Sequence, residues 1–198
     1  MINKSKIIMI FASLILICVY FFPIWSIGLE APQYPEGLGL KIWINQIGGL
    51  NKGDLAKVNN LNHYIGMKEI IPESIPELKV MPYLIGFMIV FGLVTAFSKK
   101  KFLLYSWVVV FIILMIVGLI DYYMWGYDYG HNLDPTAAIR IPGMTYQPPL
   151  IGSKKLLNFT ATSLPDIAGW IIFVSISMGV TVSFLEFKKS RIKEKSLV

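Results

Sequence analysis

The stretch that decides the fold is FLLYSWVVVFIILMIVGLIDYYMW, which runs from Phe102 to Trp125 and carries one charged residue, Asp121, near its far end. A helix needs about 20 apolar residues to cross a hydrocarbon core of about 30 Å, and this stretch is longer than that. It also lacks the alternation of apolar and polar residues that is typical of outer-membrane strands. We therefore predict a membrane-spanning helix over residues 102–125.

Three further apolar stretches flank this one and cover residues 7–29, 80–98 and 167–187. The chain of 198 residues is 55% hydrophobic and only 15% charged, whereas an ordinary soluble domain is about 25% charged. We therefore expect an all-α membrane protein, a single domain over 1–198 with four transmembrane helices. Residues 30–79 and 126–166 would then form two structured extracytoplasmic loops.

The first stretch has a second interpretation, because Lys4 and Lys6 precede it as they would precede the apolar core of a secretory signal. Cleavage of such a signal requires small residues after that core. The residues in this region are large instead: Phe21, Phe22, Pro23, Ile24 and Trp25. We therefore interpret residues 7–29 as an uncut anchor.

The basic residues predict the orientation of the chain, because positive residues close to membrane segments stay on the cytoplasmic side. In the four-helix arrangement, one side carries only Glu186 and Glu194 as acidic residues. The same side carries ten basic residues: Lys4, Lys6, Lys99, Lys100, Lys101, Lys188, Lys189, Arg191, Lys193 and Lys195. We expect both termini in the cytoplasm. The net charge of +6 then reflects topology, and we expect no nucleic-acid partner.

The two loops are expected to pack together over the outer end of the helices. The first contains a strand-like alternation over 40–45 and a segment compatible with a short helix over 58–71. Cys18 is the only cysteine, so no disulfide can join the loops within one chain. Aromatic residues near predicted helix ends indicate a belt at the membrane surface: Trp25, Tyr83, Tyr122, Tyr123, Trp125 and Trp170.

Both histidines lie in the loops, and each has a methionine in the same part of the chain. His63 and Met67 are four residues apart and would share a helix face, while His131 and Met144 belong to the second loop. Imidazole and thioether ligands together suit copper, so these four residues are candidate copper ligands. The alternative is that the histidines are hydrogen-bonding loop residues and the methionines are apolar packing contacts. Nucleophile motifs, phosphate-binding loops and zinc-protease signatures are absent from the sequence, so we expect no enzyme.

Four loop segments carry a resemblance to a known family. They are LEAPQYPEGL over 29–38, LNHYIGM over 61–67, YDYGHNLDP over 127–135 and PGMTYQPPLIG over 142–152. These segments resemble a family of small bacterial membrane proteins that accompany nitrous-oxide reductase and its copper-maturation factors. Because nitrous-oxide reductase is a periplasmic enzyme with two copper centres, the resemblance implies an inner-membrane protein whose loops face the periplasm.

The resemblance and the ligand pattern together predict an accessory role in copper handling, or in the assembly of a periplasmic copper enzyme. The expected partners are the lipid bilayer and that enzyme or its membrane assembly factors. One alternative is a membrane subunit that passes electrons from quinol to the reductase, although haem-attachment and iron–sulfur motifs are missing. Another is a structural docking subunit whose aromatic loops bind a partner.

Overall fold

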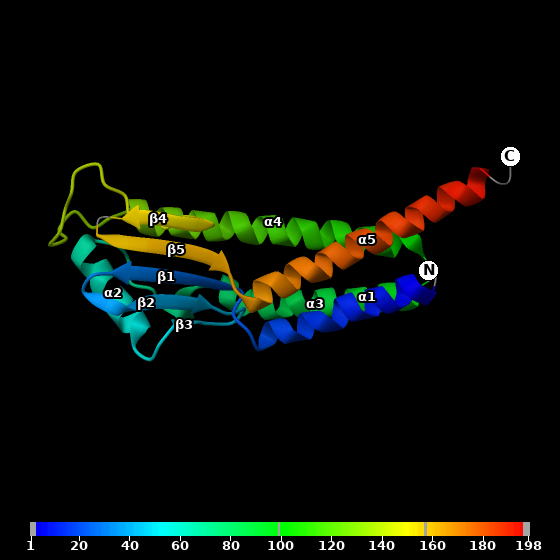
Figure 1. The fold of residues 1–198 in the computed structure, drawn as a ribbon, viewed down its shortest axis with the longest axis horizontal. Coiled ribbons are helices and arrows are strands. Elements are labelled where there is room, and N and C mark those ends of the chain that lie inside the picture. Colours follow the sequence, from blue (N-terminus) through cyan, green and yellow to red (C-terminus); the bar gives the residue numbers. More distant parts are fainter. Residues whose placement is uncertain (1–2, 99, 157, 196–198) are drawn as a thin grey trace.

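The computed structural model describes residues 3–98, 100–156 and 158–195, and it forms an elongated molecule with a helical half and a sheet half (Figure 1). Both chain ends lie at the helical end, opposite the sheet. Lys99 of the predicted basic turn lies outside the described residues, and so do the side chains of Lys193 and Lys195.

Among the described residues, three helices are long and apolar enough to cross a membrane. They are α3 (Glu77–Phe97), α4 (Lys101–His131) and α5 (Ile167–Lys195). The sequence predicted each of them, but α4 continues six residues beyond the expected end at Trp125. A helix of 31 residues is about 46 Å long, so α4 extends beyond a hydrocarbon core of about 30 Å.

The predicted helix over 7–29 is wrong, and with it the expectation of four transmembrane helices. The structure has α1 (Asn3–Ile15), then a short 3-10 helix, η1 (Leu16–Tyr20), and then strand β1 (Trp25–Ala31). Pro23 favours this change, because proline disfavours helix in the residue before it and lacks a backbone N–H. Beyond it, the Ile24 N–H donates to the Ile42 carbonyl, so the backbone is already part of a sheet. α1 packs against α3 and α5.

The predicted all-α fold is also wrong, because parts of both loops form one five-stranded antiparallel sheet. Its strand order is β3-β2-β1-β5-β4. The other strands are β2 (Tyr34–Ile42), β3 (Ile47–Gly49), β4 (Gly152–Leu156) and β5 (Phe159–Pro165). The strand-like alternation over 40–45 overlaps only the end of β2. Central strand β1 pairs with β2, which follows it in the chain, and with β5 from the other loop, so the complete sheet depends on a contact between distant segments.

Two short helical segments complete the first loop. Helix α2 (Asp54–Ile65) begins four residues before the segment predicted as helical and ends at Gly66, whose φ of +80° is favourable for glycine. The 3-10 helix η2 (Pro72–Ser74) then leads to α3. The short helix expected over 58–71 is therefore correct in type but wrong in its bounds.

The outer part of α4 covers one face of the sheet. Tyr122, Trp125 and Tyr129 of α4 pack against a buried cluster that contains Trp25 and Ile27 of β1. Ser163 of β5 joins these elements: its hydroxyl accepts the Trp25 indole N–H at 2.7 Å and donates to the Leu150 carbonyl at 3.1 Å. The predicted aromatic belt is thus partly wrong, because Trp25 belongs to the sheet core, whereas Tyr83 of α3 is 79% exposed.

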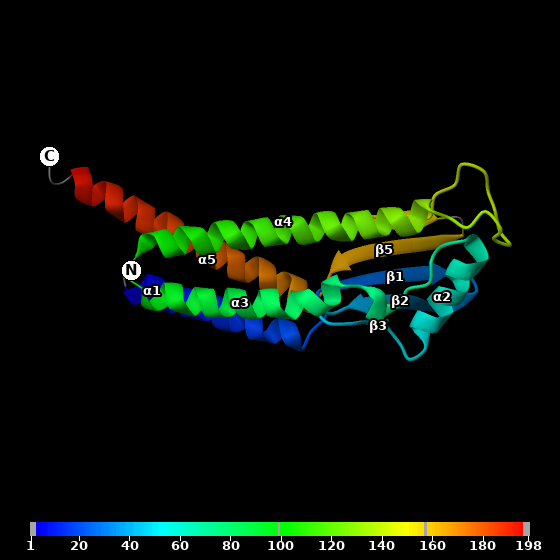
Figure 2. The same cartoon turned by 180° about the vertical axis from the view of Figure 1, so that it is seen from behind.

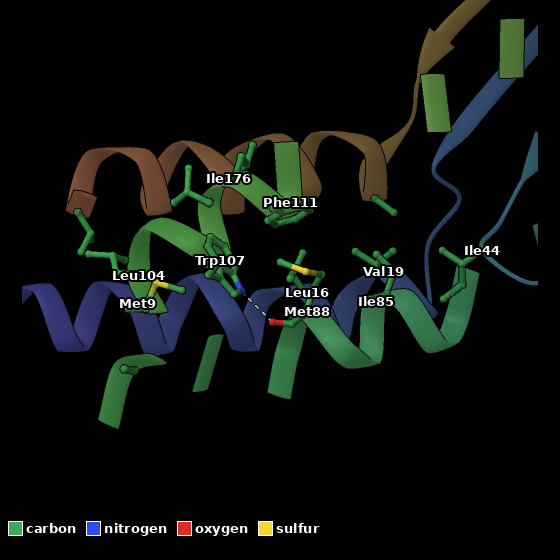
Figure 3. Packing of buried hydrophobic residues seen from close by; sticks show 14 residues of the cluster. Met9, Leu16, Val19, Ile44, Ile85, Met88, Leu104, Trp107, Phe111 and Ile176 are labelled. Atoms are coloured by element: carbon green, nitrogen blue, oxygen red, sulfur yellow. Dashed lines mark hydrogen bonds between the residues drawn. The ribbon is translucent and has the colours of Figure 1, made fainter. Parts of the chain in front are cut away.

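Trp107 of α4 fills the centre of the helical half (Figure 3). Its indole N–H donates to the Met88 carbonyl of α3 at 2.9 Å. A Cβ atom at Gly92 of α3 would lie 2.9 Å from this indole nitrogen, and a Cβ atom at Gly179 of α5 would collide with the ring. Small residues on two helices therefore make room for one large side chain from a third.

We predict that Gly179→Val destabilises the helical half, because the new side chain would push α5 away from Trp107. Overpacking of this kind costs about 1–3 kcal/mol. The thermal unfolding midpoint of the purified protein in detergent should fall by several degrees. Gly118→Val on α4 is the matched control, since a Cβ atom there meets nothing within 4 Å. Equal midpoints for the two variants would contradict this role of Gly179.

Candidate functional site

Three segments meet at the end of the molecule farthest from the chain termini, and we call this region the distal junction (Figure 2). They are the C-terminal end of α2 with Gly66 and Met67, the C-terminal end of α4, and the connection over 132–151. The Asp134 N–H donates to the Gly66 carbonyl at 2.8 Å, and the Ile139 N–H donates to the Tyr64 carbonyl at 2.9 Å. Backbone hydrogen bonds therefore hold the connection against α2.

Two glycines allow the segments of the distal junction to approach this closely. A Cβ atom at Gly66 would lie 2.9 Å from the Asp134 carbonyl oxygen. A Cβ atom at Gly130, on the last turn of α4, would collide with the backbone of Gln147. Next to this contact, the Tyr146 N–H donates to the Gly130 carbonyl at 3.0 Å. Any larger side chain at these two glycines would separate the connection from the helices.

His63 and Met67, the two candidate ligands of the first loop, lie on either side of the α2 terminus. His63 is exposed near the end of α2, and its ring lies edge-on to Tyr64 with centroids 6.1 Å apart. Met67 is half-buried and follows Gly66. Its N–H donates to the Asn62 carbonyl at 2.9 Å, so it has left the helix and does not share a helix face with His63.

His131 is the last residue of α4, and Met144 lies in the connection. The His131 ring stacks on the Tyr127 ring with centroids 3.8 Å apart. Its Nδ1 is 3.0 Å from the Tyr127 carbonyl oxygen, and this contact favours the tautomer that carries its proton on Nδ1. The Nε2 lone pair then points away from this contact and can bind a metal ion, as in many histidine metal sites. Met144 is half-buried, and its N–H donates to the Ile141 carbonyl at 3.1 Å.

The structure thus brings together the segments that carry the four candidate ligands. Within the described residues, no hydrogen bond or ring contact joins two of these four side chains. The same part of the chain has no group of three or more His, Cys, Asp or Glu residues that could hold a metal ion, a criterion that leaves methionine out. Copper binding by the four residues stays a prediction.

A polar network that the sequence did not reveal holds residues 68–70, which follow α2. The side chain of Asn59 accepts the Ile70 N–H at 2.9 Å and donates to the Ile70 carbonyl at 3.1 Å. Lys68 forms an ion pair of 2.6 Å with Asp128 of α4. The only sequence signal for this network is a pair of asparagines, Asn59 and Asn62, three residues apart on one helix face.

Asp134 shapes the start of the connection. Its Oδ1 accepts hydrogen bonds from the Thr136 hydroxyl at 2.6 Å and the Thr136 N–H at 2.7 Å. These two bonds, with a smaller contribution from the charge of His63, lower the pKa of the Asp134 carboxyl. The carboxylate is therefore held as an anion in a turn beside the end of α2.

Asp54 anchors the first turn of α2, at the end of the helix opposite His63. Its side chain is fully buried at the first turn of the helix. Burial raises the pKa of this carboxyl, but hydrogen bonds from the backbone of Asn51 and Gly39, the charge of Lys57 and the Asn51 side chain together lower it. The net effect places the pKa below its ordinary value of 3.8.

In comparisons with known proteins, no family model and no curated protein matches this chain.

We predict that the sheet half loses stability as the pH falls through the lowered pKa of Asp54. The stabilisation is complete above the unfolded-state pKa of 3.8 and is lost below the folded-state value, which is lower. Asp54→Asn lacks this titration. The difference in unfolding midpoint between wild type and variant should therefore be greatest at pH 6 and shrink towards pH 3. A difference that stays constant over this range would contradict the assignment.

Proposed function

We propose that this chain is a membrane-anchored accessory protein that binds copper at the distal junction in support of an extracytoplasmic copper enzyme. The distal junction holds His63, Met67, His131 and Met144 on segments that touch one another, although they come from two distant parts of the sequence. This convergence is the observation that carries the proposal. The two thioethers are soft ligands and the two imidazoles are borderline ligands, and copper binds both kinds.

The geometry of His131 supports the proposal further. The contact of its Nδ1 with the Tyr127 carbonyl oxygen orients the ring and leaves Nε2 to coordinate a metal ion. The stacked Tyr127 ring restricts rotation of the imidazole. Met67 and Met144 are half-buried residues, so neither is sealed inside the core.

We further propose that the helical end faces the bacterial cytoplasm and the sheet half faces the periplasm. The helical end contains both chain termini and the turn between α3 and α4 (Figure 1). The exposed basic side chains of these segments include Lys4, Lys100, Lys188, Lys189 and Arg191. Positive charge next to apolar helices favours the cytoplasmic side of an inner membrane.

The resemblance of the loop segments to proteins that accompany nitrous-oxide reductase favours a reductase of that type as the enzyme served. The resembling segments over 61–67, 127–135 and 142–152 contribute to the distal junction or to the contacts beside it. In this role the four proposed copper ligands would lie away from the membrane surface, and a periplasmic enzyme could approach them there.

The copper test uses the full chain purified in detergent. We predict that it competes with a colorimetric chelator for Cu(I) under reducing conditions. His63→Ala or His131→Ala should weaken Cu(I) binding by about tenfold or more, which corresponds to about 1.4 kcal/mol or more. Met67→Ala and Met144→Ala should have smaller effects of the same sign.

Met124→Ala is the matched control for the methionine variants, because Met124 is an exposed methionine of α4 outside the proposed ligand set. Both histidine variants should keep the wild-type unfolding midpoint, because His63 is exposed and His131 is half-exposed. Full copper occupancy in both histidine variants, or no Cu(I) binding by the wild type, would overturn the copper proposal.

The orientation test uses reporter fusions. We predict that a reporter active only in the cytoplasm works when fused after Val198 or inserted between α3 and α4. The same reporter should be silent when inserted at Gly53, which precedes α2, or at Gly152, which begins β4. Activity at Gly53 or Gly152 would reverse the orientation and remove the periplasmic assignment of the distal junction.

A further inference from the structure

The three long helices each carry an uncharged stretch of nearly the same length. The stretches are residues 80–97 of α3, 102–120 of α4 and 167–185 of α5. As helix, each is about 27–29 Å long, which matches a hydrocarbon core of about 30 Å. Asp121 ends the stretch of α4, and its carboxyl interacts electrostatically with that of Glu77, the first residue of α3. Asp166 precedes the stretch of α5. Charged residues therefore mark one level on all three helices.

Hydrogen bonds tie the turn before β1 to the same level, where the helices meet the sheet (Figure 1). The Tyr20 hydroxyl, at the end of η1, donates to the Pro82 carbonyl of α3 at 2.5 Å. The Ala168 N–H of α5 donates to the Pro23 carbonyl at 2.9 Å. The turn over residues 21–24 is therefore held beside the first turns of α3 and α5.

Large aromatic side chains lie exposed at this level on four separate segments. They are Phe21 and Phe22 in the turn before β1, Tyr83 of α3, Tyr123 of α4 and Trp170 of α5, and we call them the outer collar. Aromatic rings concentrate at the boundary between lipid and water. Phe21 is 72% exposed although it stands next to the sheet core, so the protein itself does not cover its ring.

A second set of exposed aromatic side chains lies at the opposite ends of the same helices. Phe97 ends α3, Phe102 begins α4 and Phe187 lies near the end of α5, and we call these three the inner collar. Cations lie over two of the rings. The Lys6 ammonium is 4.3 Å from the centroid of Phe97, and the Arg191 guanidinium is 4.9 Å from that of Phe187. Such pairs suit an interface at which apolar rings meet charged groups.

The distance between the collars identifies what covers the surface between them. From outer to inner collar, the helix axis runs about 21 Å along α3, 32 Å along α4 and 26 Å along α5. These lengths bracket the hydrocarbon thickness of a bilayer, and the exposed side chains between the collars are almost all apolar. Two aromatic levels at this spacing, on helices apolar enough to cross a membrane, match the two surfaces of one bilayer.

We propose that the outer collar lies at the boundary between the headgroups and the acyl chains of a phospholipid bilayer, with Phe21 and Phe22 inserted into lipid from the turn before β1. The sheet then rests directly on the headgroups. Residues 122–131 of α4 stand outside the hydrocarbon and raise His131 about 15 Å above its edge. This inference goes beyond the proposed function, because it requires neither copper nor a cytoplasmic position of the chain termini.

The first experiment measures depth with a spin label on single cysteines of the full chain in phosphatidylcholine nanodiscs. Cys18→Ser removes the only native cysteine. Exposed positions of α4 provide a ladder: Ile113, Ile120, Met124 and Tyr127. A water-soluble nickel chelate collides with labels in water and is excluded from hydrocarbon. We predict that its collision rate is about tenfold lower at Ile113 than at Tyr127 and rises mainly between Ile120 and Met124.

Leu50, beside β3, is the control position, because its exposed fraction of 49% matches the 48% of Tyr127. Labels at Leu50 and Tyr127 should give equal collision rates, as expected for two sites in water. Labels at Phe21 and Trp170 should give rates between those of Ile113 and Leu50, because both positions belong to the boundary.

The second experiment tests whether the collar anchors the protein. The double variant Phe21→Ser with Phe22→Ser removes two exposed rings, so it should leave the fold intact while weakening the hold on the lipid. We predict that the collision rate at Ile120 then rises about twofold, since interfacial aromatic anchors set the depth and tilt of a helix. Leu50→Ser should leave the rate at Ile120 unchanged.

Several outcomes would overturn the boundary proposal. A rate at Tyr127 as low as that at Ile113 would place part of the sheet half in hydrocarbon. A rate at Ile113 as high as that at Leu50 would remove α4 from the bilayer. An unchanged rate at Ile120 in the double variant would show that Phe21 and Phe22 do not anchor the chain. Loss of Cu(I) binding with the predicted depth profile would overturn the copper proposal alone.

Discussion

The pairing of β1 with β5 is the interaction on which the rest of the structure depends. β1 follows the first helical segment and β5 precedes α5, so their antiparallel register from Trp25–Pro165 to Glu30–Thr160 joins two distant parts of the chain. The pairing fixes where α1 and α5 meet: the Asp166 N–H donates to the Ile24 carbonyl, and the Ala168 N–H donates to the Pro23 carbonyl. It also places Ser163 beneath Trp25, where one hydroxyl satisfies the buried indole N–H.

α4 links the sheet half firmly to the helical half. Its inner part packs around Trp107 among α3 and α5, and its outer part covers the sheet with Tyr122, Trp125 and Tyr129. The same helix thus carries exposed aliphatic residues in one part and an aromatic, hydrogen-bonded segment in the other. Because the helix is continuous, the distal junction lies at a set distance from the apolar part of α4.

This architecture suits a protein that presents residues to a partner in the aqueous compartment. The turns of the distal junction are held by Gly66, Gly130 and Asp134, so binding need not order a flexible loop.

The sequence alone determined the three long apolar helices and the charge asymmetry, because both depend on local composition: a run of apolar residues must be covered by lipid or by protein, and lysines flank it. It also indicated that both loops are structured. It could not distinguish a membrane helix from a buried strand over Trp25–Leu29, since both environments favour the same apolar residues.

Only the tertiary structure shows that Trp25–Leu29 belongs to a strand. One partner of β1 is β2, which follows it in the chain, but the other is β5, more than a hundred residues away, and neither segment by itself reveals that second pairing. The same reason limits the site: the spacing of His63 and Met67 predicts a shared helix face, but the left-handed turn at Gly66 ends the helix between them.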